Sequence, residues 1–161
     1  MNDVSDSTLP APGLMVRLAA MVYDAFLLFA IWWAVTAVAV GYQVSQRGED
    51  AIRTSGEAAA GGPLLFSALI ASILLFYGWF WRRSGQTLGM QAWRLRLDSI
   101  DGGRPSWLQV VIRLIGAELS LTCFAMGYVW ILFDPQQRAW HDIWSKTRLV
   151  RLPKPAKKTT K

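Results

Sequence analysis

The stretch that decides the fold is residues 63–81, PLLFSALIASILLFYGWFW, which holds 19 residues without a charged side chain. A second uncharged run of 18 residues extends from Ala25 to Tyr42. A bilayer core of about 30 Å requires roughly 20 apolar residues in an α-helix. Both runs are therefore predicted to cross a membrane as helices, and not to form the buried core of a soluble protein.

The composition of the 161-residue chain agrees with a membrane protein. Hydrophobic residues make up 53% and charged residues 17%, whereas an average soluble domain has about 45–50% apolar residues with glycine counted and about 25% charged. This balance argues against a water-soluble domain and excludes a disordered chain. The net charge of +6 does not indicate nucleic-acid binding, because the basic residues flank the apolar runs. The expected partner is the lipid bilayer.

A third apolar segment, Leu114–Phe133, contains Glu118 and has basic residues on both sides. Six Lys and Arg residues lie in 82–113 and eight in 134–161. Because such residues accumulate on the cytoplasmic side, both flanks are expected in the cytoplasm, which a single crossing between them does not allow. We therefore favour two helical arms over 106–133, each about 20 Å long, that enter and leave on the same side. The alternative is a conventional third span with an exported basic tail.

Shorter elements are expected around these segments. Apolar and charged residues alternate over 93–98, and a β-prone run at 147–152 could pair with them as a small cytoplasmic β-hairpin. Asp134-Pro135 is a helix-start signal. The helix that it predicts is amphipathic and lies at the membrane interface. Its apolar face would consist of Ala139, Trp140, Ile143 and Trp144.

The predicted fold is an all-α polytopic membrane protein with two full transmembrane helices and a third segment that re-enters or spans. One membrane domain over 14–152 is expected between two tails. Residues 1–13 are polar and carry no Lys or Arg, which predicts a disordered N-terminal tail and not a signal peptide. Residues 153–161 are expected to be a basic, disordered tail that either contacts anionic lipid or stays in solvent.

Four ionisable residues are predicted to lie within or beside the helices: Arg17, Asp24, Arg113 and Glu118. An acid or a base at mid-span costs about 2.5–3.5 kcal/mol, so each is a functional hypothesis by default. Arg17 and Asp24 are seven residues apart and share one helix face. In one interpretation the four residues form a mixed cluster that fixes helix packing. In the other, Asp24 and Glu118 titrate or bind a cation while a ligand crosses.

Several motifs together resemble the RDD family of bacterial integral membrane proteins, over about residues 14–152. They are Arg17 and Asp24, Gly85-Gln86-Thr87-Leu88-Gly89-Met90, Leu95-Arg96-Leu97-Asp98 with Asp101-Gly102-Gly103-Arg104-Pro105, Arg113, and Arg138-Ala139-Trp140-His141-Asp142 with Lys146-Thr147. The resemblance implies that Arg17, Asp24 and Asp142 are the Arg and the two Asp for which the family is named. It also implies a small polytopic domain for which transport of an unidentified ligand has been suggested, with ion antiport in some members.

The sequence favours two functional hypotheses. The first is a component of the bacterial cytoplasmic (inner) membrane that transports an ion or small ligand. It would work as a homo-oligomer, because two spans and a hairpin enclose too little volume for a pore. The alternative is a non-catalytic scaffold or assembly partner of another membrane complex, which small residues in the spans would allow to pack closely.

Catalysis and cofactor or metal binding are not expected. P-loop, nucleophile-elbow, zinc-protease and dinucleotide motifs do not occur, so neither an enzyme nor a cofactor is predicted. The single cysteine, Cys123, has no partner for a disulfide or zinc motif. His141 is the only histidine, which makes it a poor metal ligand; it is expected to form a hydrogen bond to a carboxylate or a carbonyl.

Overall fold

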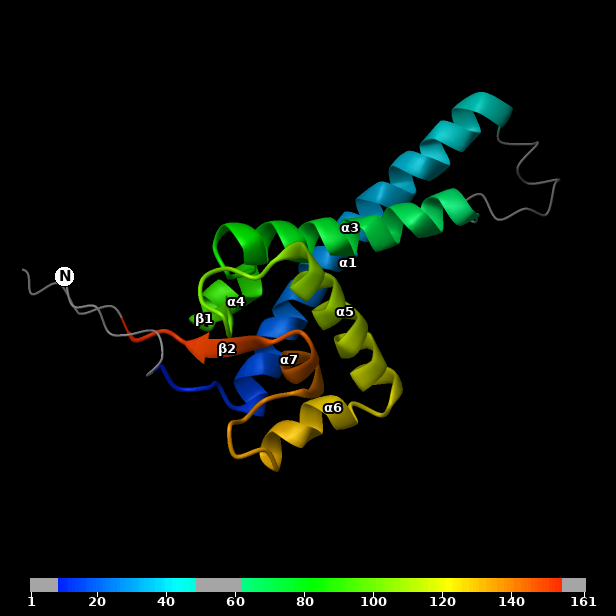
Figure 1. The fold of residues 1–161 in the computed structure, drawn as a ribbon. Coiled ribbons are helices and arrows are strands. Elements are labelled where there is room, and N and C mark those ends of the chain that lie inside the picture. The colour runs from blue at the N-terminus through cyan, green and yellow to red at the C-terminus, as the bar shows by residue number, and fades with distance from the viewer. Residues whose placement is uncertain (1–8, 49–61, 155–161) are drawn as a thin grey trace, which may run out of the picture. The chain divides into compact units, whose positions relative to one another are not determined.

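The computed structural model describes residues 9–48 and 62–154 and is mostly helical (Figure 1). Two long helices, α1 (Leu14–Arg47) and α3 (Pro63–Arg83), contain the two uncharged runs. Both are long and apolar enough to cross a membrane, which confirms the two predicted spans by length and composition. The chain divides into two compact units, Met1–Asp24 with Gly78–Lys161 (unit 1) and Ala25–Tyr77 (unit 2).

Unit 2 contains the apolar part of α1 and most of α3. Trp32 of α1 donates an indole hydrogen bond of 3.0 Å to the hydroxyl of Ser72 on α3. Large apolar side chains on both helices remain exposed, including Phe26, Trp33 and Phe66. A helix that is apolar on most of its faces requires an apolar surrounding, which a bilayer supplies.

The third apolar segment forms two arms, as predicted, but they are unequal. The first is α5 (Trp107–Thr122), and the second is α6 (Met126–Val129) continued by the short 3-10 helix η2 (Trp130–Leu132). The arms are bent by 106° at Phe124 and Ala125, whose left-handed φ angles of 55° and 59° end the first helix. Gly127 permits this bend, because a Cβ atom there would lie 2.1 Å from the Ser120 hydroxyl oxygen.

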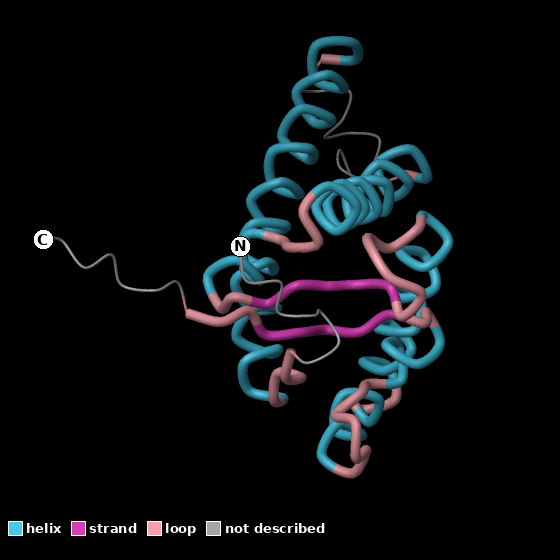
Figure 2. Tube along the Cα trace, turned by 60° about the vertical axis from the view of Figure 1, so that its left-hand side comes forward, coloured by secondary structure: helices cyan, strands magenta, loops and turns pink. Residues whose placement is uncertain are grey.

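The two predicted strands pair as expected, although not as a hairpin. β1 (Leu95–Ser99) and β2 (Thr147–Arg151) form a two-stranded antiparallel sheet in which Leu97 lies opposite Leu149 (Figure 2). In the sequence the two strands are separated by α5, α6, η2 and a further short helix, α7 (Trp140–Trp144), so the helical arms are an insertion between them. The sheet therefore places β2, the last element of unit 1, beside β1, which follows α3 and α4 (Leu88–Ala92).

The predicted amphipathic helix is present but shorter than expected. α7 spans only Trp140–Trp144, because Gln137 has a φ of 53° and Ala139 is extended. Its buried residues are His141 and Asp142, whereas Ile143 and Trp144 are 37% and 49% exposed. These two apolar residues face outward, as in a helix at a membrane interface, but Ala139 of the predicted apolar face is fully buried.

The predicted tails are described only in part. Residues 1–8 and 155–161 lie outside the described residues. Residues 9–13 differ from a solvated tail, because Pro12 is fully buried and the carbonyl of Pro10 accepts a hydrogen bond from the backbone of Arg151. This segment therefore belongs to unit 1, beside β2.

Candidate functional site

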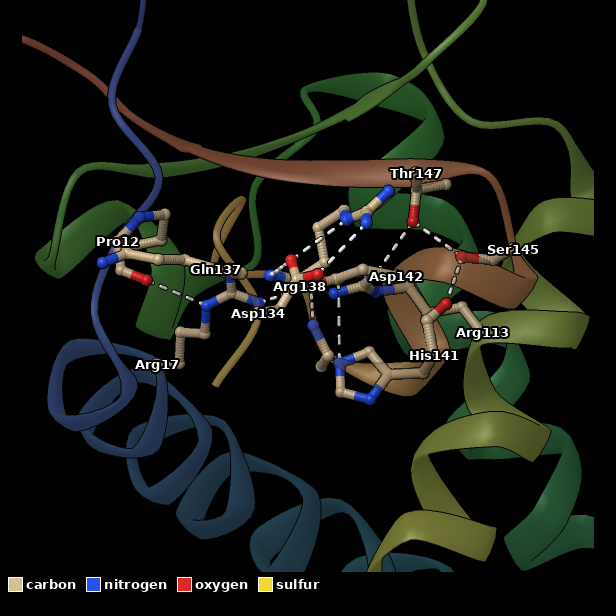
Figure 3. A network of polar contacts seen from close by, with 11 residues as sticks. Pro12, Arg17, Arg113, Asp134, Gln137, Arg138, His141, Asp142, Ser145 and Thr147 are labelled. Carbon is tan, nitrogen blue, oxygen red and sulfur yellow. Dashed lines mark hydrogen bonds and ion pairs between the residues drawn. The ribbon is translucent and has the colours of Figure 1, made fainter. Parts of the chain in front are cut away.

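The centre of unit 1 is a carboxylate held by two guanidinium groups (Figure 3). Arg17 of α1 donates to Oδ2 of Asp142 on α7 at 2.5 Å, and Arg113 of α5 donates to Oδ1 at 2.6 Å. The three side chains are 5%, 7% and 1% exposed, in the order Arg17, Arg113 and Asp142. Charged groups are almost never buried to this degree unless they are paired. We call these three residues the RDR cluster.

Further hydrogen bonds fix the geometry of the RDR cluster. Two further donors of Arg17 reach the carbonyls of Pro12 and Gln137, at 3.1 and 2.7 Å. Arg113 also donates to the Thr147 hydroxyl at the start of β2, at 2.7 Å. Asp142 accepts a further hydrogen bond of 2.9 Å from the backbone N–H of Ala139. The cluster therefore connects α1, α5, α7 and β2 within unit 1.

Burial and the neighbouring charges have opposite effects on the pKa of Asp142. Burial by itself raises the pKa of Asp142, but the adjacent guanidinium groups of Arg113 and Arg17 outweigh it and hold that pKa below its usual value. Asp142 is thus ionised. Two positive charges face one negative charge, so the RDR cluster carries a net charge of +1.

His141 does not form the hydrogen bond that we expected. Its Nε2 atom lies 3.8 Å from Oδ1 of Asp142, too far for a hydrogen bond, and its ring packs against Tyr128 with a centroid distance of 4.7 Å. Its buried Nδ1 atom has no hydrogen-bond partner among the described residues. Burial, followed by repulsion from Arg113, lowers the pKa of His141 to about 3. The imidazole is therefore neutral at physiological pH.

The depressed pKa of His141 predicts a specific loss of stability in acid. Below the unfolded-state pKa of about 6.5, the unfolded chain binds a proton at His141 that the folded chain does not. The free energy of unfolding should therefore fall by about 1.4 kcal/mol for each pH unit below 6.5, until the pH approaches 3. Thermal unfolding in detergent between pH 7 and 4.5 should show a steeper decline for the wild type than for His141→Gln. Equal slopes would contradict the prediction.

The second buried acid, Asp24, contacts a different part of unit 1. Its Oδ2 atom accepts a hydrogen bond of 2.5 Å from the Thr87 hydroxyl, and its Oδ1 atom accepts one of 2.9 Å from the backbone of Gly89. Thr87 is the N-cap of α4 and accepts from the backbone of Met90 at 3.2 Å. Asp24 therefore holds the first turn of α4 against α1. A carboxylate is favourable at the N-terminal end of α4, because the backbone N–H groups there have no partner within the helix.

Two glycines, Gly85 before α4 and Gly89 within it, allow the chain to pack closely here. A Cβ atom on Gly89 would lie 2.3 Å from the carbonyl oxygen of Ala20 and 2.8 Å from Oδ1 of Asp24. Gly85 has a φ of +75°, a conformation that favours glycine. Gln86 extends the connection by donating to the carbonyl of Leu95 at 2.5 Å. The segment therefore fits closely onto α1 and β1.

The structure separates the four ionisable residues that the sequence grouped together. Arg17 and Asp24 do share the buried face of α1, and Arg17 and Arg113 converge. The acid between them is Asp142, however, while Asp24 is taken up by Thr87 and Gly89. Glu118 lies on an exposed part of α5. The predicted mixed cluster is therefore wrong in its acids, because the fold brings α7 between the beginning of α1 and α5 (Figure 1).

Apolar side chains cover the outside of the α5–α7 region. Exposed residues there are Leu108, Ile115, Leu119, Phe124, Met126, Trp130, Leu132, Phe133, Ile143 and Trp144. The buried residues include apolar side chains such as Val110, Tyr128 and Ile131 as well as the polar groups of the RDR cluster. Soluble proteins rarely expose contiguous apolar patches of this kind, and the exposed apolar residues fit an environment of lipid.

A pocket of about 390 Å³ opens beside the RDR cluster. Its volume lies within the range of about 300–1,000 Å³ that is usual for small-molecule sites. Its polar wall contains Arg17 and Asp142 themselves. The complete lining consists of Leu9, Ala11, Arg17, Ile100, Gln136, Gln137, Arg138, Asp142, Arg148, Leu149 and Val150, all within unit 1.

Comparison with known proteins agrees with these features. A family model described as the RDD family matches residues 11–146, which is most of the chain and includes Asp24 and all three residues of the RDR cluster. The match confirms the resemblance drawn from the motifs. No curated protein and no solved structure shows significant similarity to the chain.

Proposed function

The chain belongs to the RDD family, and from this premise we propose that it is a multi-pass membrane component that binds a small polar ligand during transport. The pocket beside the RDR cluster supports this proposal most directly, because it brings a ligand-sized volume against ionised side chains in a unit with an apolar exterior. In this proposal the chain lies in a bacterial cytoplasmic membrane. The basic segments 82–113 and 134–161 face the cytoplasm, in keeping with the positive-inside rule.

The buried charges act in this proposal as a fixed framework and not as mobile carriers. Both oxygens of Asp142 are occupied by arginine donors, and both oxygens of Asp24 accept hydrogen bonds. A carboxylate that released a cation or a proton at each cycle would have to break these contacts. We therefore assign ligand contact to the pocket, and assign Asp24 to the packing of α4 on α1.

Transport requires more than one copy of the chain. Two helices are able to span by length and composition, or three if the bent pair is one span, and so few helices do not surround a conducting path. Small residues along α1 remain exposed and offer a surface on which helices approach closely. They are Ala30, Ala34, Ala37 and Gly41. We propose a homo-oligomer that contacts itself along this face.

The same exposed small residues favour the alternative function of a scaffold for another membrane protein. In that case the chain would bind its partner without moving a solute. The two functions differ in what reconstitution into lipid vesicles shows. The transport proposal predicts that vesicles containing the chain alone exchange a solute, whereas the scaffold function predicts that they do not.

The transport test uses proteoliposomes and compares fluxes of protons, sodium, inorganic phosphate and glycerol 3-phosphate. We expect flux of at least one solute to fall about tenfold or more when Arg138→Gln alters the pocket wall. The control variant Arg47→Gln removes the same charge from an exposed position outside the pocket lining, and should leave the flux unchanged. If no solute of this panel crosses in any sample, the transport proposal fails and the scaffold function is favoured.

A further inference from the structure

The pocket beside the RDR cluster has a positive electrostatic environment. Among the described residues that line it, Asp142 is the one acid, and it is already shared by Arg17 and Arg113. The half-buried guanidinium of Arg138 forms another part of the wall and is balanced by Asp134, which binds it through two contacts of 3.1 Å. Among the described residues of the wall, no further acid offsets the net charge of +1 on the RDR cluster.

This excess charge is costly in the interior of the protein. A buried charge is tolerated when an opposite charge and hydrogen bonds compensate it. The guanidinium of Arg113 also lies 5.5 Å from the centroid of the Trp81 ring, but such an interaction recovers only part of the lost solvation. An anion in the pocket would balance the excess positive charge of the RDR cluster. The electrostatic potential of the pocket therefore favours an anionic ligand over a cation or a neutral molecule.

The other residues that line the pocket indicate which kind of anion fits it. The lining includes the polar residues Gln136, Gln137, Arg138 and Arg148 and the apolar residues Leu9, Ile100, Leu149 and Val150. Planar guanidinium groups recognise oxyanions through paired hydrogen bonds. A bare oxyanion leaves most of 390 Å³ empty, so the wall fits an oxyanion that carries a short carbon chain.

We infer that the pocket of unit 1 binds a phosphate ester, with the phosphate beside Arg17 and Arg138 and the carbon part against Ile100 and Leu149. The inference rests on the proposed function in one respect: it names the class of ligand that binds in the same pocket. Two sources supply this chemistry: a free phosphate ester such as glycerol 3-phosphate, and the headgroup of an anionic phospholipid.

The test measures binding to the purified full chain and does not depend on transport. The free source is probed with glycerol 3-phosphate added to delipidated protein in detergent, by calorimetry. The lipid source is probed by native mass spectrometry of protein taken from nanodiscs of phosphatidylglycerol or phosphatidylcholine. Binding of glycerol 3-phosphate assigns the free source; selective retention of phosphatidylglycerol alone assigns the lipid source. The absence of both overturns the inference.

Two variants of one residue separate charge from shape. Ile100 is 53% exposed and lines the pocket, so the fold should tolerate a polar residue there. Ile100→Glu adds a negative charge and should raise the dissociation constant for the phosphate ester at least tenfold. Ile100→Gln has nearly the same shape without the charge and should change it less than threefold. Equal effects of the two variants, or tighter binding by Ile100→Glu, would overturn the inference.

The binding experiment and the flux experiment test the two proposals separately, because either proposal can be wrong while the other holds. If the phosphate ester binds but no solute crosses, the transport proposal is wrong and the pocket assignment holds. If a cation crosses and the phosphate ester does not bind, transport holds and the ligand class is wrong. Circular dichroism of each variant shows whether the helices are retained, so that unfolding is not mistaken for lost binding.

Discussion

Asp142→Asn is expected to lower the free energy of unfolding by about 3–5 kcal/mol, the range for removing one partner of a buried ion pair. The variant keeps nearly the same volume but leaves Arg17 and Arg113 facing one another without the carboxylate that separates them. The loss should therefore come from two uncompensated guanidinium groups and not from a cavity. Reversible unfolding in mixed detergent and sodium dodecyl sulfate micelles measures this free energy.

A second aspartate of the same chain provides a matched control. Asp134 also accepts hydrogen bonds from an arginine, but its partner Arg138 is 34% exposed at the side chain and stays hydrated when the carboxylate is lost. Exposed ion pairs contribute about 0–1 kcal/mol. Asp134→Asn should therefore lower the free energy of unfolding much less than Asp142→Asn does. Similar losses for the two variants would mean that the RDR cluster is no more important to the fold than a surface pair.

Gly89→Ala is expected to destabilise the protein by about 3 kcal/mol, at the upper end of the usual range for overpacking. The added methyl group would meet the carbonyl oxygen of Ala20 at 2.3 Å. That oxygen belongs to the backbone of α1 and cannot rotate away, so α4 must move and weaken the hydrogen bond from Gly89 to Asp24. The same unfolding experiment in detergent measures the change.

The control for this variant is Gly41→Ala, also an exchange of glycine for alanine. A Cβ atom on Gly41 meets no other atom within 4 Å, and the position lies within α1. Alanine favours a helix over glycine by about 1 kcal/mol, so the control should be neutral or slightly stabilising. If Gly89→Ala is as harmless as Gly41→Ala, α4 does not pack on α1 as closely as the structure shows.

The elements that depend on local sequence could be predicted before the structure was known. Uncharged runs of 18 and 19 residues predicted α1 and α3, because length and hydropathy suffice to identify a span. Alternation of apolar and charged residues predicted the first strand, and a β-prone run predicted the second and that the two could pair. The small sheet was misjudged only in its connection, since a pattern of alternation carries no information on what lies between two strands.

The pairings at the site could not be predicted from spacing. Arg17 and Asp142 are 125 residues apart in sequence, and Arg113 and Asp142 are 29 apart, so no helical period connects them. Glu118 was grouped with the arginines because it is an acid in an apolar segment, yet it lies on an exposed part of α5. Only the resemblance of the final motif to the family pointed to Asp142.

The orientation of α7 agrees with the interfacial helix that the sequence predicted. An apolar face is directed inward in water, whereas in lipid it is directed outward. The sequence identified the apolar residues Ile143 and Trp144, and both are exposed. With lipid outside, the interior can be polar, and His141 and Asp142 occupy it.

A direct interaction between Arg17 and Asp142 holds α1 and α7 together. A double-mutant cycle with Arg17→Gln, Asp142→Asn and the combined variant measures that interaction from three free energies of unfolding in detergent. We expect a coupling of about 2 kcal/mol, within the range for residues in one buried network, so that the combined variant is clearly more stable than the sum of the single losses predicts. Free energies that add to within about 0.5 kcal/mol, as they do for distant residues, would contradict the account.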